Sequence, residues 1–240
     1  IDKASIDYRF FFNGCTNITV TNTITENTLT AQTTRGTTLF ENCCASNAIG
    51  AVNTKSDFIS LVQGTFNKLY YVGLTNQGCV SLTSCRNLTF NDVVCYGWGS
   101  KATNAQNLFA SGSNDISFTN IKLLGYGINL SQCNRVEITN VDYIDRTIGN
   151  SSASPQTNLF NISSCNNVVV NNVTFGLSGT LSGQHNCTGR ILSSGNVVDV
   201  SVRNIGTFSS PINTGSTTGT YFSAIFADTG NSTNIRLQRI

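Results

Sequence analysis

The fold of this chain is decided by a stretch that recurs along it, Cys165-Asn166-Asn167-Val168-Val169-Val170-Asn171-Asn172-Val173-Thr174-Phe175. Each copy begins with a small residue, continues with alternating apolar and polar residues, and ends in a polar residue, usually Asn, followed by another apolar one. The other copies begin at Cys15, Cys85, Ser113, Cys133, Val197 and Ser232. Their spacing is irregular but averages about 29 residues, within the range of stacked-repeat proteins. The repeat therefore predicts a solenoid.

The alternation within each copy is typical of a strand with one buried face. In the quoted copy, Val168 and Val170 should face inward, and alternation carries Asn172 inward as well, although Val173 beside it is also apolar. Two adjacent inward residues require a bend, and Asn tolerates the left-handed conformation of such a bend. A buried amide must be hydrogen-bonded, so we expect a ladder of inward-facing asparagines. The predicted ladder residues are Asn22, Asn120, Asn140, Asn172 and Asn204.

A second apolar pair precedes the copies, as in Leu108-Phe109 and Leu159-Phe160. Each coil is thus predicted to hold three short strands around a core of Val, Ile, Leu, Phe and Cys. This pattern resembles the right-handed parallel β-helix of the pectate-lyase-like proteins, which has three sheets and an asparagine ladder. The resemblance implies an all-β fold. We expect one continuous domain, a fragment of a longer chain, with an N-terminal cap and weakly repeated coils in residues 1–78 and regular coils in residues 79–240.

Composition excludes several classes of function. The 240 residues carry a net charge of +2 and only 11% charged residues, so nothing predicts nucleic-acid binding. No run of about 20 apolar residues predicts membrane insertion. The chain has nine cysteines and one histidine. Four of these cysteines share a repeat position that also accepts Ser or Val, which favours free thiols in small buried slots over disulfides. We expect neither a metal site nor a cofactor.

Candidate catalytic residues come from a short search, because acidic residues are few. Asp142 and Asp145 lie close together in sequence, and Glu137 lies one strand earlier at an outward position. Glycoside hydrolysis uses two carboxylates roughly 5–10 Å apart. The alternative is that Asp142 is a solvated strand residue and that Asp145 pairs with Arg146 or opens a turn. The motifs of the polygalacturonases that the fold resembles are absent from this sequence.

Candidate ligand-binding residues are aromatic or basic side chains in the variable connections. Trp98, the only tryptophan, stands between glycines beside Tyr96, and Tyr126 also stands between glycines. Exposed aromatic faces mark recognition sites, although Trp98 could equally cover the coil as a lid or pack at a subunit interface. Tyr143 and Arg146 could hold a sugar beside the acidic residues.

The Asn-, Thr- and Ser-rich composition is similar to that of bacteriophage tailspikes and tail fibres. That resemblance implies a virion protein, folded in the host cytoplasm and acting outside the cell. Its partners would be a cell-surface polysaccharide, two further copies in a homotrimer, and other tail or baseplate proteins. The low charge favours a neutral glycan. The alternatives are a polysaccharide-cleaving glycosidase or lyase of the same fold, and a structural or adhesin solenoid without its own activity.

Overall fold

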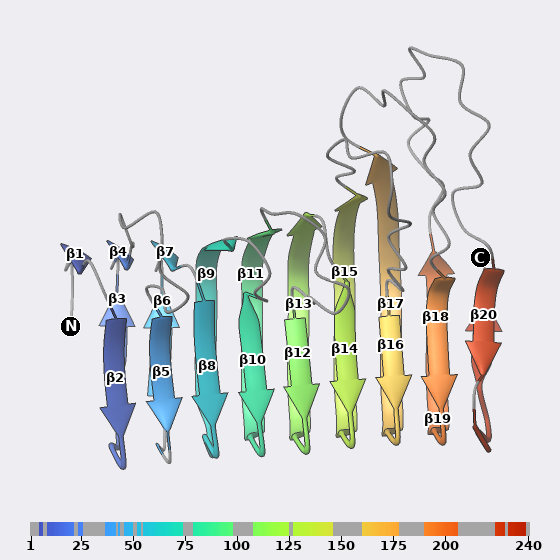
Figure 1. Cartoon of the computed structure of the whole chain (residues 1–240), viewed down its shortest axis with the longest axis horizontal. Coiled ribbons are helices and arrows are strands. Elements are labelled where there is room, and N and C mark those ends of the chain that lie inside the picture. The colour runs from blue at the N-terminus through green and yellow to red at the C-terminus, as the bar shows by residue number, and fades with distance from the viewer. Residues whose placement is uncertain are drawn as a thin grey trace, which may run out of the picture.

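The computed structural model describes residues 5–6, 9–21, 24–25, 37–41, 43, 46–49, 52–53, 55–73, 79–97, 108–124, 127–145, 160–177, 190–205, 224–228 and 230–238. Every regular element in these ranges is a β-strand, and neighbouring strands pair in parallel. The rungs follow one another in sequence order along the long axis (Figure 1). The fold is therefore an all-β parallel β-solenoid, as the repeat predicts.

The described strands form two sheets. The nine-stranded sheet contains β2 (Arg9–Asn13), β5 (Thr37–Glu41), β8 (Lys55–Ile59), β10 (Val80–Thr83), β12 (Leu108–Ser111), β14 (Ile128–Ser131), β16 (Phe160–Ser163), β18 (Arg190–Gly195) and β20 (Ala224–Asp228). The twelve-stranded sheet contains β1 (Ser5–Ile6), β3 (Thr19–Thr21), β4 (Ile24–Thr25), β6 (Ser46–Ile49), β7 (Val52–Asn53), β9 (Gly64–Gly73), β11 (Arg86–Gly97), β13 (Asn114–Leu124), β15 (Asn134–Asp145), β17 (Asn166–Leu177), β19 (Val198–Ile205) and β21 (Arg236–Gln238).

The second and third predicted strands of a coil are the two halves of one bent strand from β9 onward. Both β6 and β7 pair with β9, the first along its beginning and the second along its end. The bend lies at residues with left-handed backbone, with φ of 57° at Asn120, 58° at Asn140 and 56° at Asn172. Three strands per coil are thus distinct only in the early rungs.

The asparagine ladder exists, but its predicted inward orientation is wrong. Asn120, Asn140 and Asn172 are exposed, whereas the apolar residue after each is buried. Left-handed backbone interrupts the alternation of the strand, so two successive side chains face outward before the chain turns inward again. Asn204 occupies the same register position in β19, and Asn22 lies outside the described residues.

The turn between the two sheets belongs to the same stack. Gly112, with φ of 58°, opens it, and Asp115, also with φ of 58°, closes it. Ser113 between them is buried. The backbone N–H of Gly112 donates to Ser131 O at 2.9 Å, and that of Asn114 donates to Cys85 O at 2.9 Å. The turn therefore bonds to the rungs on both sides, and its interior position forms a column.

That column contains the thiols that the sequence assigns to small buried slots. Cys85, Cys133 and Cys165 are buried in it, and the seven described cysteines are all free, as expected. The backbone N–H of Cys133 donates to the Cys165 sulfur at 3.3 Å. The Cys165 thiol donates to Ser163 O at 3.2 Å. Interaction between the neighbouring Cys133 and Cys165 thiols lowers the pKa of Cys133 and raises the pKa of Cys165.

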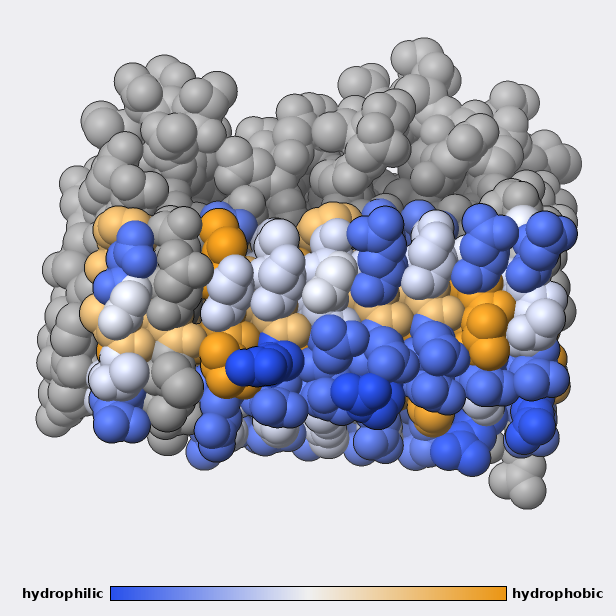
Figure 2. Space-filling model, turned by 90° about the horizontal axis from the view of Figure 1, so that it is seen from below, coloured by the Kyte–Doolittle hydropathy of each residue, from blue (hydrophilic) through white to orange (hydrophobic). Residues whose placement is uncertain are grey.

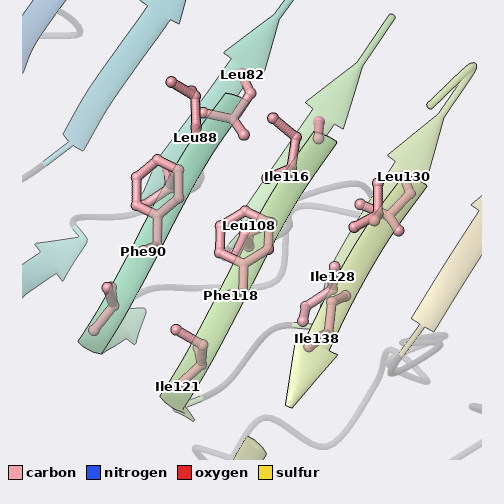
Figure 3. Packing of buried hydrophobic residues seen from close by; sticks show 14 of the residues in the cluster. Leu82, Leu88, Phe90, Leu108, Ile116, Phe118, Ile121, Ile128, Leu130 and Ile138 are labelled. Atoms are coloured by element: carbon pink, nitrogen blue, oxygen red, sulfur yellow. The ribbon is translucent and has the colours of Figure 1, made fainter. Parts of the chain in front are cut away.

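The core between the sheets is a set of apolar columns (Figure 3). Phe118 aligns with Ile138 and then Val170, while Ile116 aligns with Val136 and then Val168. The rings of Phe66, Phe90 and Phe118 stack with successive centroids 4.9 Å apart. Burying one such ring stabilises the fold by about 1.5–3 kcal/mol. The core thus makes a stiff support for whatever the outer surfaces present.

Candidate functional site

The outward side of the bent strands carries two rows of polar residues, which we call the polar face. The rows run from β9 to β17 and consist of Thr65, Thr89, Ser117, Glu137 and Val169, and of Asn67, Asn91, Thr119, Thr139 and Asn171. All but Glu137 and Val169 carry a hydroxyl or an amide. Parallel strands lie about 4.8 Å apart, so each row repeats its hydrogen-bonding groups at that interval.

The polar face is ordered by contacts between its own side chains. Asn91 Nδ2 donates to Asn67 Oδ1 at 2.8 Å, and Thr139 Oγ1 donates to Glu137 Oε1 at 3.4 Å. Glu137 is exposed at an outward position, where the sequence predicts it. These contacts restrain four of the ten side chains of the polar face, so a ligand would not have to order those four.

The asparagine ladder borders the polar face. Asn172 Nδ2 donates to Asn140 Oδ1 at 3.1 Å, Asn140 Nδ2 donates to Asn120 Oδ1 at 3.0 Å, and Asn120 Nδ2 donates to Asp92 Oδ1 at 2.9 Å. The ladder thus bonds side chain to side chain, not to the backbone of the neighbouring coil. All its amide dipoles point the same way and end on the carboxylate of Asp92.

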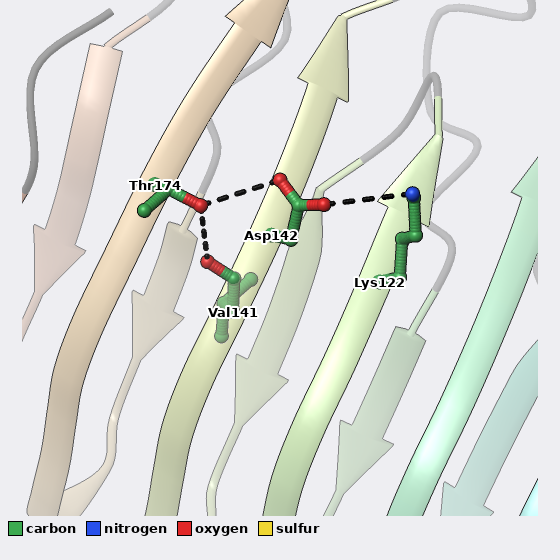
Figure 4. A network of polar contacts seen from close by, with 4 residues as sticks. All are labelled: Lys122, Val141, Asp142 and Thr174. Carbon is green, nitrogen blue, oxygen red and sulfur yellow. Dashed lines mark hydrogen bonds and ion pairs between the residues drawn. The ribbon is translucent and has the colours of Figure 1, made fainter.

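Beyond the bend lies a small charged network (Figure 4). Lys122 Nζ is 3.6 Å from Asp142 Oδ2, and Thr174 Oγ1 lies 3.2 Å from Asp142 Oδ1. The three residues align across β13, β15 and β17. The side chains of Lys122 and Asp142 are 46% and 50% exposed, so solvent screens their attraction. Asp142 is therefore a solvated strand residue that is paired with a cation.

The structure does not bring the predicted catalytic residues into a described pair. Glu137 and Asp142 lie on the same strand, five residues apart and on opposite sides of the bend at Asn140. The path along the strand is about 16 Å and includes the bend, so it does not give the separation of the two carboxylates, and the catalytic pair stays a prediction. Asp145 ends β15, and its side chain is outside the described part.

The predicted aromatic and basic ligands are mostly outside the described residues, as Trp98, Tyr126 and Arg146 are. Tyr96 is placed in β11 by its backbone alone. Tyr143 is only 3% exposed and belongs to the core cluster, so its ring does not face a ligand in solvent.

A further row of left-handed residues, which the sequence did not lead us to predict, closes the turns between the two sheets. It contains Asn87, Asp115, Arg135, Asn167, Asp199 and Asn234. Arg135 Nη2 donates to Asp115 Oδ2 at 2.7 Å, and Asn234 Nδ2 donates to Asp199 Oδ1 at 2.9 Å. The hydrogen bond from Arg135 lowers the pKa of Asp115. On the side of the molecule where the turns lie, hydrophilic residues cover much of the described surface, and hydrophobic residues form a broken row across its middle (Figure 2). The sequence does contain a pattern that could have predicted this row, since Asn or Asp recurs two residues after the small residue that begins most copies of the repeat.

Within the described ranges, no group of three or more His, Cys, Asp or Glu side chains is placed to hold a metal ion. Nor does this part of the chain contain a helix that is long and apolar enough to cross a membrane.

The fold and the polar face define the class of the protein as a parallel β-solenoid with a polar ladder surface. No protein-family model matches the chain, and no curated protein matches it in sequence. Several solved structures resemble it, among them three that are each 12% identical to it in sequence.

The first is a candidate glycosyl hydrolase of Parabacteroides merdae, with a TM-score of 0.40 over 81% of this chain and 79% of that one. The second is the ORF18 protein of Geobacillus virus E2, with a TM-score of 0.48 over 93% and 54%. The third is the surface adhesin PfbA of Streptococcus pneumoniae, with a TM-score of 0.30 over 98% and 76%. These likenesses are distant and concern the fold, not an activity.

Proposed function

We propose that the chain is a receptor-binding domain of a bacteriophage tail fibre or tailspike and that its polar face binds a polysaccharide of the bacterial surface. The observation that carries the proposal is the pair of hydroxyl and amide rows on successive rungs. Sugars are recognised by hydrogen bonds to their hydroxyl groups, and Ser, Thr and Asn side chains both donate and accept them. A polymer lying along the rungs would meet similar groups at each step.

Two further properties support an extended, mostly uncharged ligand. The polar face has one charged residue, Glu137, between β9 and β17. Its backbone is held by the sheet and by the phenylalanine stack beneath, so binding orders few groups. Preorganisation of this kind raises affinity because less conformational entropy is lost on binding.

The proposal includes a homotrimer in the virion, attached to other tail or baseplate proteins. Light scattering of the purified chain would give the mass of three copies if trimerisation needs only these residues. A monomer would instead limit the proposal to the binding face.

The binding face is tested with Thr119→Glu, which puts a charged side chain in the middle of the polar face. Asn129→Glu is the matched control, because Asn129 lies outward on β14 of the nine-stranded sheet. We expect Thr119→Glu to weaken binding to purified bacterial surface polysaccharides at least tenfold, and Asn129→Glu to leave binding unchanged. Equal effects of the two variants would show that the face is not the site.

The same assay separates the alternatives. Release of reducing ends, abolished by Asp142→Asn, would make the protein a depolymerase. No binding to any surface polysaccharide would favour a structural or adhesin solenoid. Circular dichroism of each variant would confirm that the fold is intact.

A further inference from the structure

The two rows of the polar face continue beyond β17, and there they include two arginines. On β19 the outward residues are Ser201 and Arg203, and on β21 they are Arg236 and Gln238. Ser201 aligns with Arg236, and Arg203 aligns with Gln238. The two arginines are thus diagonal neighbours on adjacent rungs, with Cα atoms about 8 Å apart from strand spacing and rise per residue.

Both arginine side chains point away from the core. Val200, beside Ser201 on the strand, is fully buried, and Leu237, between Arg236 and Gln238, packs against the core. By alternation the flanking residues face outward, and Arg203, Arg236 and Gln238 are all exposed. The two guanidinium groups can therefore converge on one ligand above the sheet.

Two other cations of this sheet are paired with carboxylates. Lys122 lies 3.6 Å from Asp142, and Arg135 binds Asp115. Beside Arg203 and Arg236, the row partners are Asn171, Val169, Ser201 and Gln238, none of which is acidic. Asp199, on the same strand as Arg203, accepts a hydrogen bond from Asn234.

We infer that Arg203 and Arg236 form an anion-binding end of the polar face and that the polysaccharide carries carboxylate or phosphate groups at intervals on an otherwise uncharged chain. Guanidinium groups match both anions through paired N–H donors. The amides of Asn171 and Gln238 and the hydroxyl of Ser201 supply further hydrogen-bonding groups around them. This inference rests on the proposed function, because it names the chemistry of the ligand for the same face.

The test compares binding of the 240-residue chain to three probes by affinity electrophoresis. The probes are polygalacturonate for the carboxylate, poly(glycerol phosphate) teichoic acid for the phosphate, and dextran as an uncharged polymer. We expect the chain to bind at least one anionic probe more tightly than dextran. The double variant Arg203→Gln with Arg236→Gln should bind that probe at least tenfold more weakly.

Arg86→Gln is the matched control, because Arg86 is an exposed arginine of the same sheet at the start of β11. It should leave binding to the anionic probe unchanged. Raising NaCl from 0.05 to 0.5 M should weaken binding of the unchanged chain much more than that of the double variant, since exposed charges are screened by salt.

The outcomes separate this inference from the proposed function. Binding to dextran or to a neutral surface polysaccharide, with no preference for anionic probes, would overturn the inference and leave the proposed function standing. An equal loss in Arg86→Gln and the double variant would overturn it too, by showing a general charge effect. Absence of binding to every polysaccharide would remove both.

Discussion

Left-handed backbone at residues other than glycine is the feature of single residues that shapes every coil. It occurs at the bends of β9, β11, β13, β15 and β17 and at one or two residues of the turn before each of them. Asn and Asp adopt this conformation with less strain than other residues because their short polar side chains can bond locally. The same positions then stack, so a preference of the backbone becomes a row of side chains along the molecule.

Replacement of Asn140 tests this coupling. Asn140→Ala puts a residue that has no side-chain amide to bond locally at a left-handed bend. It also removes the hydrogen bonds to Asn120 and Asn172. We expect it to lower the free energy of unfolding by about 2 kcal/mol. Asn140→Gly loses the same contacts but relieves the strain, so its loss should be under about 1 kcal/mol. Urea denaturation measures both, and equal losses would show that backbone strain is not involved.

The Asp115–Arg135 pair predicts a pH dependence. Arg135 lowers the pKa of Asp115 in the folded state. Stability from this pair is therefore present above the unfolded pKa of about 3.9 and is lost as pH falls through the lower folded value. Because both side chains are exposed, the effect should be small and sensitive to salt.

The Asp115→Asn variant is a suitable comparison, since Asn occupies the same row at Asn87 and Asn167. The urea midpoint of the unchanged chain should exceed that of the variant at pH 6 and approach it near pH 2.5. A constant difference at both pH values would contradict the assigned role.

At the level of strands, the alternation of apolar residues predicts the buried faces, but pairs of adjacent apolar residues do not reveal which member is inside. In the nine-stranded sheet, Leu108 aligns with Ile128 on the next rung, and Ile128 aligns with Phe160 on the rung after that, so the pairs Leu108-Phe109 and Leu159-Phe160 are offset by one residue. A one-residue shift exchanges the faces of a strand. Which residue of an apolar pair faces inward is decided by the strand with which it pairs, and that strand belongs to another coil.

The phenylalanine stack is the element in which packing is most concentrated. Phe90 is fully buried and stacks on Phe66 and Phe118 at 4.9 Å on each side. We expect Phe90→Ala to lower the free energy of unfolding by about 3–5 kcal/mol through lost burial and a cavity. Phe11→Ala is the control, because Phe11 is 51% exposed and its replacement should change stability by no more than about 0.5 kcal/mol. Similar losses in both variants would contradict the described core.

At the scale of the whole molecule, the sequence is sufficient for the solenoid but not for its site. The repeat predicts stacking because each copy must bury the same face, and that constraint is local in sequence. A site depends on which outward residues meet across rungs, as Lys122, Asp142 and Thr174 do. Which residues meet depends on the lengths of the loops and on the orientation of the bend. The sequence pattern is the same whether the asparagine at the bend faces inward or outward.

A stack of rungs also predicts how stability is distributed along the molecule. Each rung contacts only its neighbours, so its stability is the sum of its own contribution and of two interfaces. In the middle of the stack, Phe90, Leu130 and Ile138 are fully buried. Near the two ends of the described stack, Ile18 and Leu237 pack against the core only in part.

Hydrogen exchange should therefore show a gradient along the solenoid axis. In the 240-residue chain, we expect the amides of β11 to β17 to exchange slowest, through global unfolding, and those of β3 and β21 to exchange through local opening. The predicted gradient follows the rung order, so β13 should be better protected than β19 although both belong to one sheet. Uniform protection of all rungs would mean that the stack unfolds only as a whole, and the nearest-neighbour description would then be wrong.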